Sequence, residues 1–287
     1  MSSRSSTDLS VAPGNSAAGG SCPAAGPAPA CRVEPAGPPV VLPDRDGWQT
    51  RRRRAIWRRA ALAGQGFTTV ILDIGGVIVP SLFESVALPD FPRGPLAAEP
   101  AYREVEQGRR SERAYWAGVA EQRPDLDLGR LWRDCTGLRP AMMAAIATML
   151  SRMRVVAFTN DMAYWFGDDW LTGRFADLQA LDDVLEARDF GVLKPDPRAY
   201  HLAAERIGEK PEHCLFVDDH QANLDGAAAV GMATQLFDVT TPQQTVAALL
   251  ARLALPEAEP PRIFRQPATG EEHGRQARQR RHAGTGS

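Results

Sequence analysis

The chain has 287 residues, of which 44% are hydrophobic, enough for one sizeable core and at most two compact units. Its formal net charge of −2 gives no reason to expect nucleic acid or an anionic membrane as the partner of the whole chain. No uninterrupted apolar stretch approaches the roughly 20 residues that span a bilayer, and no apolar segment follows a basic start at the N-terminus, so we expect a cytoplasmic protein.

The first 45 residues are rich in Ser, Ala, Gly and Pro, a composition that buries too little apolar surface to become ordered. We expect disordered tails at 1–45 and, for the same reason, at 256–287. Residues 46–66 contain the basic stretch RRRRAIWRRAALAG at 51–64. Because no aromatic interleaving accompanies it, a solvated linker or frayed helix is favoured over a site for RNA or an anionic surface.

Four short apolar runs bounded by turns are typical of buried parallel strands: FTTVIL (67–72), VVAFT (155–159), CLFV (214–217) and TQLF (234–237). Helical periodicity appears between them, in PAMMAAIATMLSRM (140–153), DPRAYHLAAERIG (196–208) and NLDGAAAVG (223–231). This alternation predicts an α/β fold with a doubly wound parallel sheet, whose core comprises 67–82 and 138–255.

Residues 83–137 break this rhythm, since they show helical pattern and no convincing strand. An insert placed directly after the first strand would lie over the strand ends, where α/β sheets place their sites. We therefore expect a small all-helical cap domain at 83–137.

The cysteines give no sign of a metal or disulfide scaffold. There are four of them, none in C-x-x-C spacing and two in the low-complexity tail: Cys22, Cys31, Cys135 and Cys214. The sequence therefore predicts neither a zinc site nor a disulfide framework.

Polar side chains stand at or just beyond the carboxyl ends of the predicted strands: Asp73, Thr159, Asn160, Lys194, Asp218 and Asp219. Each alone has a plainer explanation as a helix cap, a turn or a surface residue. Together they place three carboxylates, a hydroxyl, an amide and an ammonium at one edge of the sheet. Clustered acids are unfavourable unless a cation lies among them, and hard oxygen ligands suit Mg²⁺.

Four segments resemble the ordered motifs of the haloacid dehalogenase-like hydrolase superfamily: LDIGGVIVP, AFTND, GVLKPDPRAYHLAAERIG and CLFVDDHQANLDGAAAVGMAT. The resemblance covers about 67–240, and the helical stretch after the first motif is similar to that family's cap. It implies a Rossmann-like core and a hydrolase.

The resemblance also implies roles for individual residues. Asp73 would be the nucleophile that forms an aspartyl-phosphate, and Lys194 would hold the nucleophile and the phosphoryl charge together. Thr159 and Asn160 would hydrogen-bond the phosphoryl oxygens of the substrate, and Gly76 corresponds to the family's turn glycine beside them.

The implied Mg²⁺ ligands are the carboxylates of Asp73, Asp218 and Asp219 and the backbone carbonyl of Gly75. Phosphatases of this superfamily usually carry a second Asp at position 75, which donates a proton to the leaving alkoxide and then activates water. A glycine cannot move a proton, so general acid–base help of ~10²–10⁴-fold would be missing unless another group supplies it. Candidates for that group are His220 and Glu106, although a residue in such a position is more often a plain surface residue.

The preferred interpretation is a Mg²⁺-dependent phosphatase that acts on a small phosphorylated metabolite. A C–halogen hydrolase is an alternative, because that branch also lacks the second Asp, but it works without metal and does not keep the paired acids Asp218 and Asp219. A catalytically weak member that binds a ligand or a partner protein is another. The substrate and the oligomeric state are not readable from the sequence; candidate anion contacts in the cap are Arg109, Arg110 and Arg113.

Overall fold

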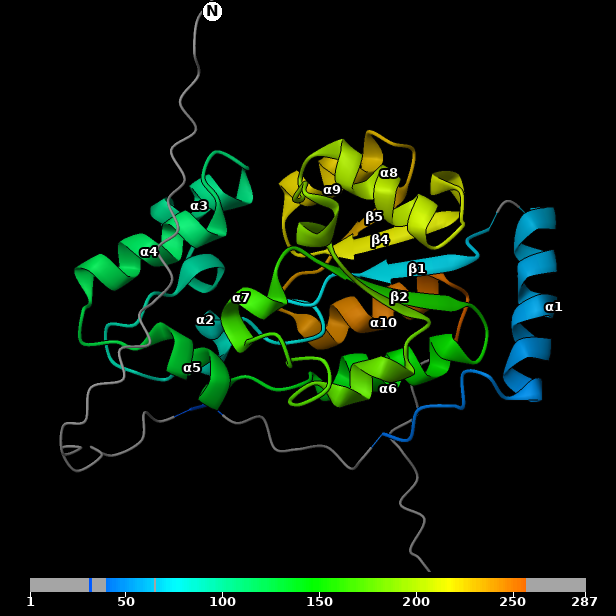
Figure 1. Cartoon of the computed structure of the whole chain (residues 1–287), viewed down its shortest axis with the longest axis horizontal. Coiled ribbons are helices and arrows are strands. Elements are labelled where there is room, and N and C mark those ends of the chain that lie inside the picture. Colours follow the sequence, from blue (N-terminus) through cyan, green and yellow to red (C-terminus); the bar gives the residue numbers. More distant parts are fainter. Residues whose placement is uncertain (1–30, 33–39, 65, 257–287) are drawn as a thin grey trace, which may run out of the picture.

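Five parallel strands form the central sheet of the protein, whose computed structural model describes residues 31–32, 40–64 and 66–256 (Figure 1). The strand order is β3-β2-β1-β4-β5, with every neighbouring pair parallel. The strands are β1 (Thr69–Leu72), β2 (Arg154–Thr159), β3 (Asp183–Glu186), β4 (Cys214–Asp218) and β5 (Ala233–Leu236). The doubly wound α/β fold predicted from the sequence is confirmed.

Helices cover both faces of the sheet. Alternate residues of β1 point to opposite faces, so that Val70 and Leu72 belong to one apolar cluster and Ile71 to the other. The first cluster is completed by α6 (Pro140–Leu150) and α10 (Pro242–Arg252), the second by α8 (Pro197–Arg206) and α9 (Gln221–Ala228). Short connecting helices are α7 (Met162–Phe166) and the 3₁₀ turns Gly94–Ala97, Ala176–Ala180, Ala187–Phe190 and Pro211–His213.

The insert after β1 is helical, as predicted, and no sheet strand lies within 83–137, all of which the structure describes. It comprises α2 (Leu82–Ser85), α3 (Pro100–Glu106), α4 (Glu112–Gln122) and α5 (Leu128–Cys135). These helices pack around a separate apolar core that includes the fully buried Phe83, Tyr115 and Trp116. The cap lies beyond the carboxyl ends of the strands (Figure 1).

A disulfide joins Cys31 to Cys135, at the end of α5, across 104 residues of sequence. The expectation that the cysteines form no disulfide is therefore wrong for this pair, and the neighbouring Arg32 N–H donates to the Ser85 carbonyl at 2.8 Å. The predicted disorder at 1–45 is wrong for these two residues and for 40–45, where Val40 and Leu42 pack against the core and Arg45 donates to the Leu181 carbonyl, while 1–30, 33–39 and 257–287 lie outside the described residues. Disulfides are rare in reducing compartments, so this bond does not support the predicted cytoplasmic location.

The basic stretch forms the helix α1 (Trp48–Gly64), which lies beside the amino ends of the strands (Figure 1). The helix is continuous, so the prediction of a linker or a frayed helix is wrong, but most of its described side chains are exposed to solvent as predicted. The Trp57 indole N–H donates to the Phe67 carbonyl at 3.1 Å, and Arg54 pairs with Asp182. Arginine, alanine and leucine are good helix formers, which explains the continuous helix, while tertiary contacts fix its place. No described helix is both long and apolar enough to cross a bilayer.

Candidate active site

A lysine lies between two carboxylates at the carboxyl edge of the sheet. Lys194 Nζ lies 2.8 Å from Asp73 Oδ1 and 2.9 Å from Asp218 Oδ2, and it donates to the Phe158 carbonyl at 3.1 Å. Asp73 follows β1 and Asp218 ends β4, so two neighbouring parallel strands deliver both acids to the same edge. The structure thus brings together three of the residues that the sequence predicted to converge.

Burial sets the charge states of this group. Burial raises the pKa of Asp73 to about 6, although the Lys194 ammonium opposes the rise. Burial alone would lower the pKa of Lys194, but Asp218 and Asp73 raise it well above its ordinary value. Lys194 is therefore a permanent cation shared by two acids.

Asp218 is fully buried, and donors already surround its carboxylate. Oδ1 accepts from the His220 backbone N–H at 2.9 Å and from the Asn223 side-chain amide at 3.0 Å, while Oδ2 accepts from Lys194. Asp218 therefore anchors Lys194. The motif comparison gave Asn223 no role, although the residue stands within the fourth motif.

Asp219 faces the loop that follows β1. Gly76 has a φ of +73°, and a Cβ at this position would overlap the Asp219 carboxylate, so both backbone conformation and space require glycine. Burial raises the pKa of Asp219 to about 8; His220 opposes the rise, and repulsion from Asp218 and Asp73 adds to it. Without a bound cation, the protein environment therefore disfavours the ionised form of Asp219.

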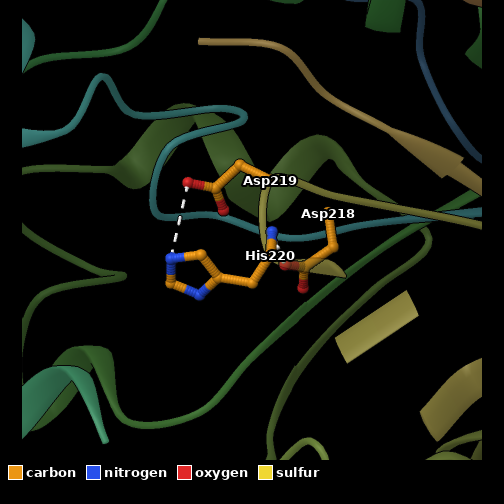
Figure 2. A group of neighbouring side chains, drawn as sticks. All are labelled: Asp218, Asp219 and His220. Atoms are coloured by element: carbon orange, nitrogen blue, oxygen red, sulfur yellow. Dashed lines mark hydrogen bonds and ion pairs between the residues drawn. The ribbon is translucent and has the colours of Figure 1, made fainter. Parts of the chain in front are cut away.

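His220 lies between Asp219 and the cap. Figure 2 shows its ring facing Asp219, whose Oδ2 lies 3.9 Å from His220 Nε2, while the Asp218 carboxylate lies beside the His220 backbone. The same Nε2 lies 2.9 Å from the Tyr102 hydroxyl of α3. Burial alone would lower the pKa of His220, but the carboxylates of Asp219 and Glu112 raise it to about 9. His220 thus links the sheet edge to the cap.

The donor set fits a hard divalent cation. The ligand atoms of Asp218, Asp219 and His220 lie within 4.8 Å of one another. Burial, with some repulsion from neighbouring carboxylates, raises the pKa values of Asp73 and Asp219, and a cation among the carboxylates would stabilise their charged forms. Carboxylate oxygens are the ligands that Mg²⁺ prefers.

A cavity of about 390 Å³ separates this edge from the cap. The predicted site residues that line it are Asp73, Gly75, Gly76, Thr159, Asn160, Lys194 and Asp219. His220 lines it too, and the cap contributes Tyr102, Arg110, Glu112 and Arg113. Arg109 and Glu106 are not among the lining residues. The arrangement is a partly open cavity in which the Asp73 carboxylate and the Lys194 ammonium lie together below the cap.

The family model for haloacid dehalogenase-like hydrolases matches residues 67–231. The chain belongs to this family. Mouse acyl-CoA dehydrogenase family member 10 is 31% identical over 118 residues, which are 41% of this chain and 11% of that protein. The GMP/IMP nucleotidase YrfG of Escherichia coli is 43% identical over 67 residues, 23% of this chain and 30% of that enzyme. The (S)-2-haloacid dehalogenase 4A of Burkholderia cepacia is 39% identical over 56 residues, 20% and 24% of the two chains.

The chain thus spans less than a third of the length of each of these relatives. Among solved structures, a haloacid dehalogenase family enzyme of Bacteroides thetaiotaomicron in complex with magnesium and inorganic phosphate has a TM-score of 0.40 and 14% identity. That likeness covers 61% of this chain and 96% of the other.

In this haloacid dehalogenase-like site, Asn160 holds the main chain of Lys194. Its Oδ1 accepts from the Lys194 N–H at 2.8 Å, and its Nδ2 donates to the Lys194 carbonyl at 3.3 Å. The predicted contact of Asn160 with a phosphoryl oxygen stays a prediction. These two contacts hold the loop that contains Lys194 in place, and thereby position its ammonium group.

A buried arginine supports the loop after β1. Arg139 is 2% exposed, donates to the carbonyls of Gly76 at 2.9 Å and Val77 at 3.1 Å, and pairs with Glu84 at 2.9 Å. Sequence analysis missed this residue because nothing in the local pattern distinguishes it from a surface arginine before a helix.

The three cap arginines that the sequence nominated differ in their surroundings. Arg109 is exposed and pairs with Glu104, away from the cavity. Arg113 pairs with Asp161 of the sheet edge, and its guanidinium lies 3.9 Å from the centre of the Tyr164 ring. Arg110 donates to the Ala114 carbonyl at 2.6 Å. Two of the three therefore remain available as anion contacts of the cavity.

Proposed function

We propose that the protein is a Mg²⁺-dependent phosphatase that hydrolyses a small phosphorylated metabolite through an aspartyl-phosphate. The observation that carries the proposal is the shared position of Lys194 between Asp73 and Asp218, with Asp219 in the same cavity. One ammonium pairs with two carboxylates, and a third carboxylate lies in the same cavity. This arrangement suits a nucleophile that must attack an anionic phosphate, because both the metal and the ammonium reduce the repulsion.

Asp73 would attack the phosphorus of a monoester, the bond from phosphorus to the leaving oxygen would break, and the alkoxide would take a proton from solvent. Water would then attack the phosphorus of the aspartyl-phosphate, releasing inorganic phosphate and restoring Asp73. Lys194, which holds Asp73 Oδ1 at 2.8 Å, would orient the nucleophile and keep it ionised. Thr159 and Asn160 would bind the phosphoryl oxygens.

The metal would be held by Asp73, Asp219 and the Gly75 carbonyl, with Asp218 close by. Because the Asp218 oxygens already accept hydrogen bonds from His220, Asn223 and Lys194, Asp219 is the more available of the paired acids. When bound, Mg²⁺ supplies Lewis-acid stabilisation of the phosphoryl charge.

Two relatives suggest which substrates to test. The similarity to a GMP/IMP nucleotidase supports nucleoside monophosphates as the first phosphate esters. The similarity to an (S)-2-haloacid dehalogenase, together with Gly75, keeps the C–halogen hydrolase as the competing function. The paired acids Asp218 and Asp219 favour the phosphatase.

The test is phosphate release from GMP, IMP and an aryl phosphate with Mg²⁺ or with EDTA, beside chloride release from a 2-chloro acid. We expect phosphate release that requires Mg²⁺ and is abolished in Asp73→Asn. The exposed Asp225→Asn on α9 is the matched control and should retain activity. Metal-independent chloride release would instead establish the dehalogenase, and binding without turnover would support the catalytically weak alternative.

A further inference from the structure

The helix α1 concentrates positive charge that the rest of the chain lacks. Its sequence, WQTRRRRAIWRRAALAG, contains six arginines and no acid. Because the whole chain has 33 basic and 35 acidic residues, everything outside α1 carries a formal charge of −8. Positive and negative charge are therefore unevenly distributed over the molecule, although its net charge is only −2.

Only part of this charge is used within the fold. Arg54 pairs with Asp182, and Arg58 Nη2 lies 3.2 Å from Glu209 Oε2. The other four arginines of the helix are exposed: Arg51, Arg52, Arg53 and Arg59. The buried face of α1, formed by Thr50, Arg54, Trp57 and Ala61, is thus distinct from an outer face with surplus charge.

Two large apolar side chains lie on this outer face. Trp48 is 63% exposed and Ile56 is 57% exposed. With Arg52 and Arg59 they follow helical spacings of four, four and three residues, so the four side chains form one outward stripe. We call these four residues the docking face.

The docking face lies at the end of the molecule opposite the cap (Figure 1). The inner contacts of α1 are with residues that precede strands: Phe67 before β1, Asp182 before β3 and Glu209 before β4. The catalytic cavity lies at the other ends of these strands. A surface bound to α1 would therefore leave the cavity open to the solution.

We propose that the docking face binds the protein peripherally to an anionic lipid bilayer. Exposed arginines are attracted to anionic headgroups, and tryptophan and isoleucine insert at the boundary between headgroups and acyl chains. A nucleic-acid backbone would use the arginines but gives an exposed isoleucine no favourable contact. The combination of charge and apolar side chains on one stripe therefore favours the bilayer, and it revises the expectation from net charge that a membrane is no partner.

The experiment is sedimentation of the full chain with vesicles of phosphatidylcholine, alone or mixed with phosphatidylserine. We expect binding only to the mixed vesicles, weakened by added salt because the charges are exposed. Arg52→Glu/Arg59→Glu should reduce partitioning by at least roughly 25-fold, since each basic residue contributes about fivefold. The matched control, Arg103→Glu/Arg206→Glu, makes the same charge change at exposed positions outside α1 and should bind as the wild type does.

Ile56→Ser distinguishes the two anionic partners. It should weaken vesicle binding by roughly tenfold, because it removes an apolar side chain from the interface. Unchanged melting temperatures would show that the variants remain folded. The proposal is overturned if the wild type does not sediment with phosphatidylserine vesicles, or if Ile56→Ser binds them normally. Tight binding to RNA that needs Arg52 and Arg59 but not Ile56 would overturn it in favour of nucleic acid.

Discussion

Gly75→Asp is expected to accelerate the hydrolysis of phosphate esters with poor leaving groups. A Cβ at Gly75 meets no atom within 4 Å, and its φ lies outside the positive range that Gly76 adopts. The loop can therefore accept the side chain without steric cost, whereas Gly76→Ala would press on Asp219. The substitution places a carboxyl group in the cavity beside the nucleophile.

The magnitude follows from the neighbours of the new group. A carboxyl at position 75 would lie close to Asp73 and Asp219, whose own pKa values are raised to about 6 and about 8. The same burial and repulsion would hold the new carboxyl protonated nearer to neutral pH, which suits a general acid. General acid–base catalysis contributes ~10²–10⁴-fold, and we expect about 10- to 100-fold in kcat/KM for alkyl phosphates at this unadapted position.

The assay is kcat/KM for a series of phosphate monoesters of increasing leaving-group acidity, on the wild type and on two variants. The wild type should depend steeply on leaving-group acidity, and Gly75→Asp should flatten that dependence. Gly75→Asn is the matched control, since the asparagine side chain has the same size as aspartate and no acidic proton. Its kcat/KM for alkyl phosphates should not exceed that of the wild type. A flat dependence in the wild type would refute the reasoning and direct attention to His220→Ala and Glu106→Gln.

Three further predictions concern charge and cross-linking. Burial raises the pKa of Asp73 to about 6, so its ionisation destabilises the metal-free fold as pH rises towards about 6; the stability of the wild type relative to that of Asp73→Asn, measured by denaturant unfolding in EDTA, should therefore fall over this range, and a relative stability independent of pH would contradict this. The raised pKa of Asp219 means that a proton competes with the metal, so Mg²⁺ affinity measured by calorimetry should rise with pH and level off above about 8; an affinity independent of pH would count against Asp219 as a ligand. Reduction of the Cys31–Cys135 bond should lower the free energy of unfolding by about 2–4 kcal/mol, and urea unfolding of Cys135→Ser should be insensitive to reductant.

The sequence predicts the parts of the fold that depend on local pattern. β1, β2, β4 and β5 begin and end within two residues of the predicted apolar runs. For β1, β2 and β4 the reason is that strands buried on both faces need uninterrupted apolar residues, whereas β5 is a half-buried edge strand. The strand β3, with sequence DVLE, was missed because it lies at the sheet edge, where half-buried acids are tolerated. The convergence of Asp73 and Lys194 was predictable because parallel strands place their carboxyl ends at one edge.

Contacts between distant segments were not predictable. Cys31 and Cys135 are 104 residues apart, and no spacing rule pairs them. Two hydrogen bonds of the site also join residues far apart in the sequence. Asn160 accepts from the Lys194 main chain, and Arg139 donates to the Gly76 carbonyl. Composition does not encode such distances. The inner face of α1 could not be predicted because it contains an arginine. The charge of an arginine indicates an exposed residue, although its aliphatic part can pack against the protein.

The separate apolar core of the cap has a consequence for how the cavity opens. Across the α3–α4 side, cap and sheet edge meet through the polar pairs Tyr102–His220 and Arg113–Asp161, which water can replace at little cost. At α5 the contact is aromatic instead, with the Trp132 ring 5.8 Å from that of Trp165. A separation of α3 and α4 from the sheet edge would break these polar pairs, whereas a separation at α5 would expose aromatic surface.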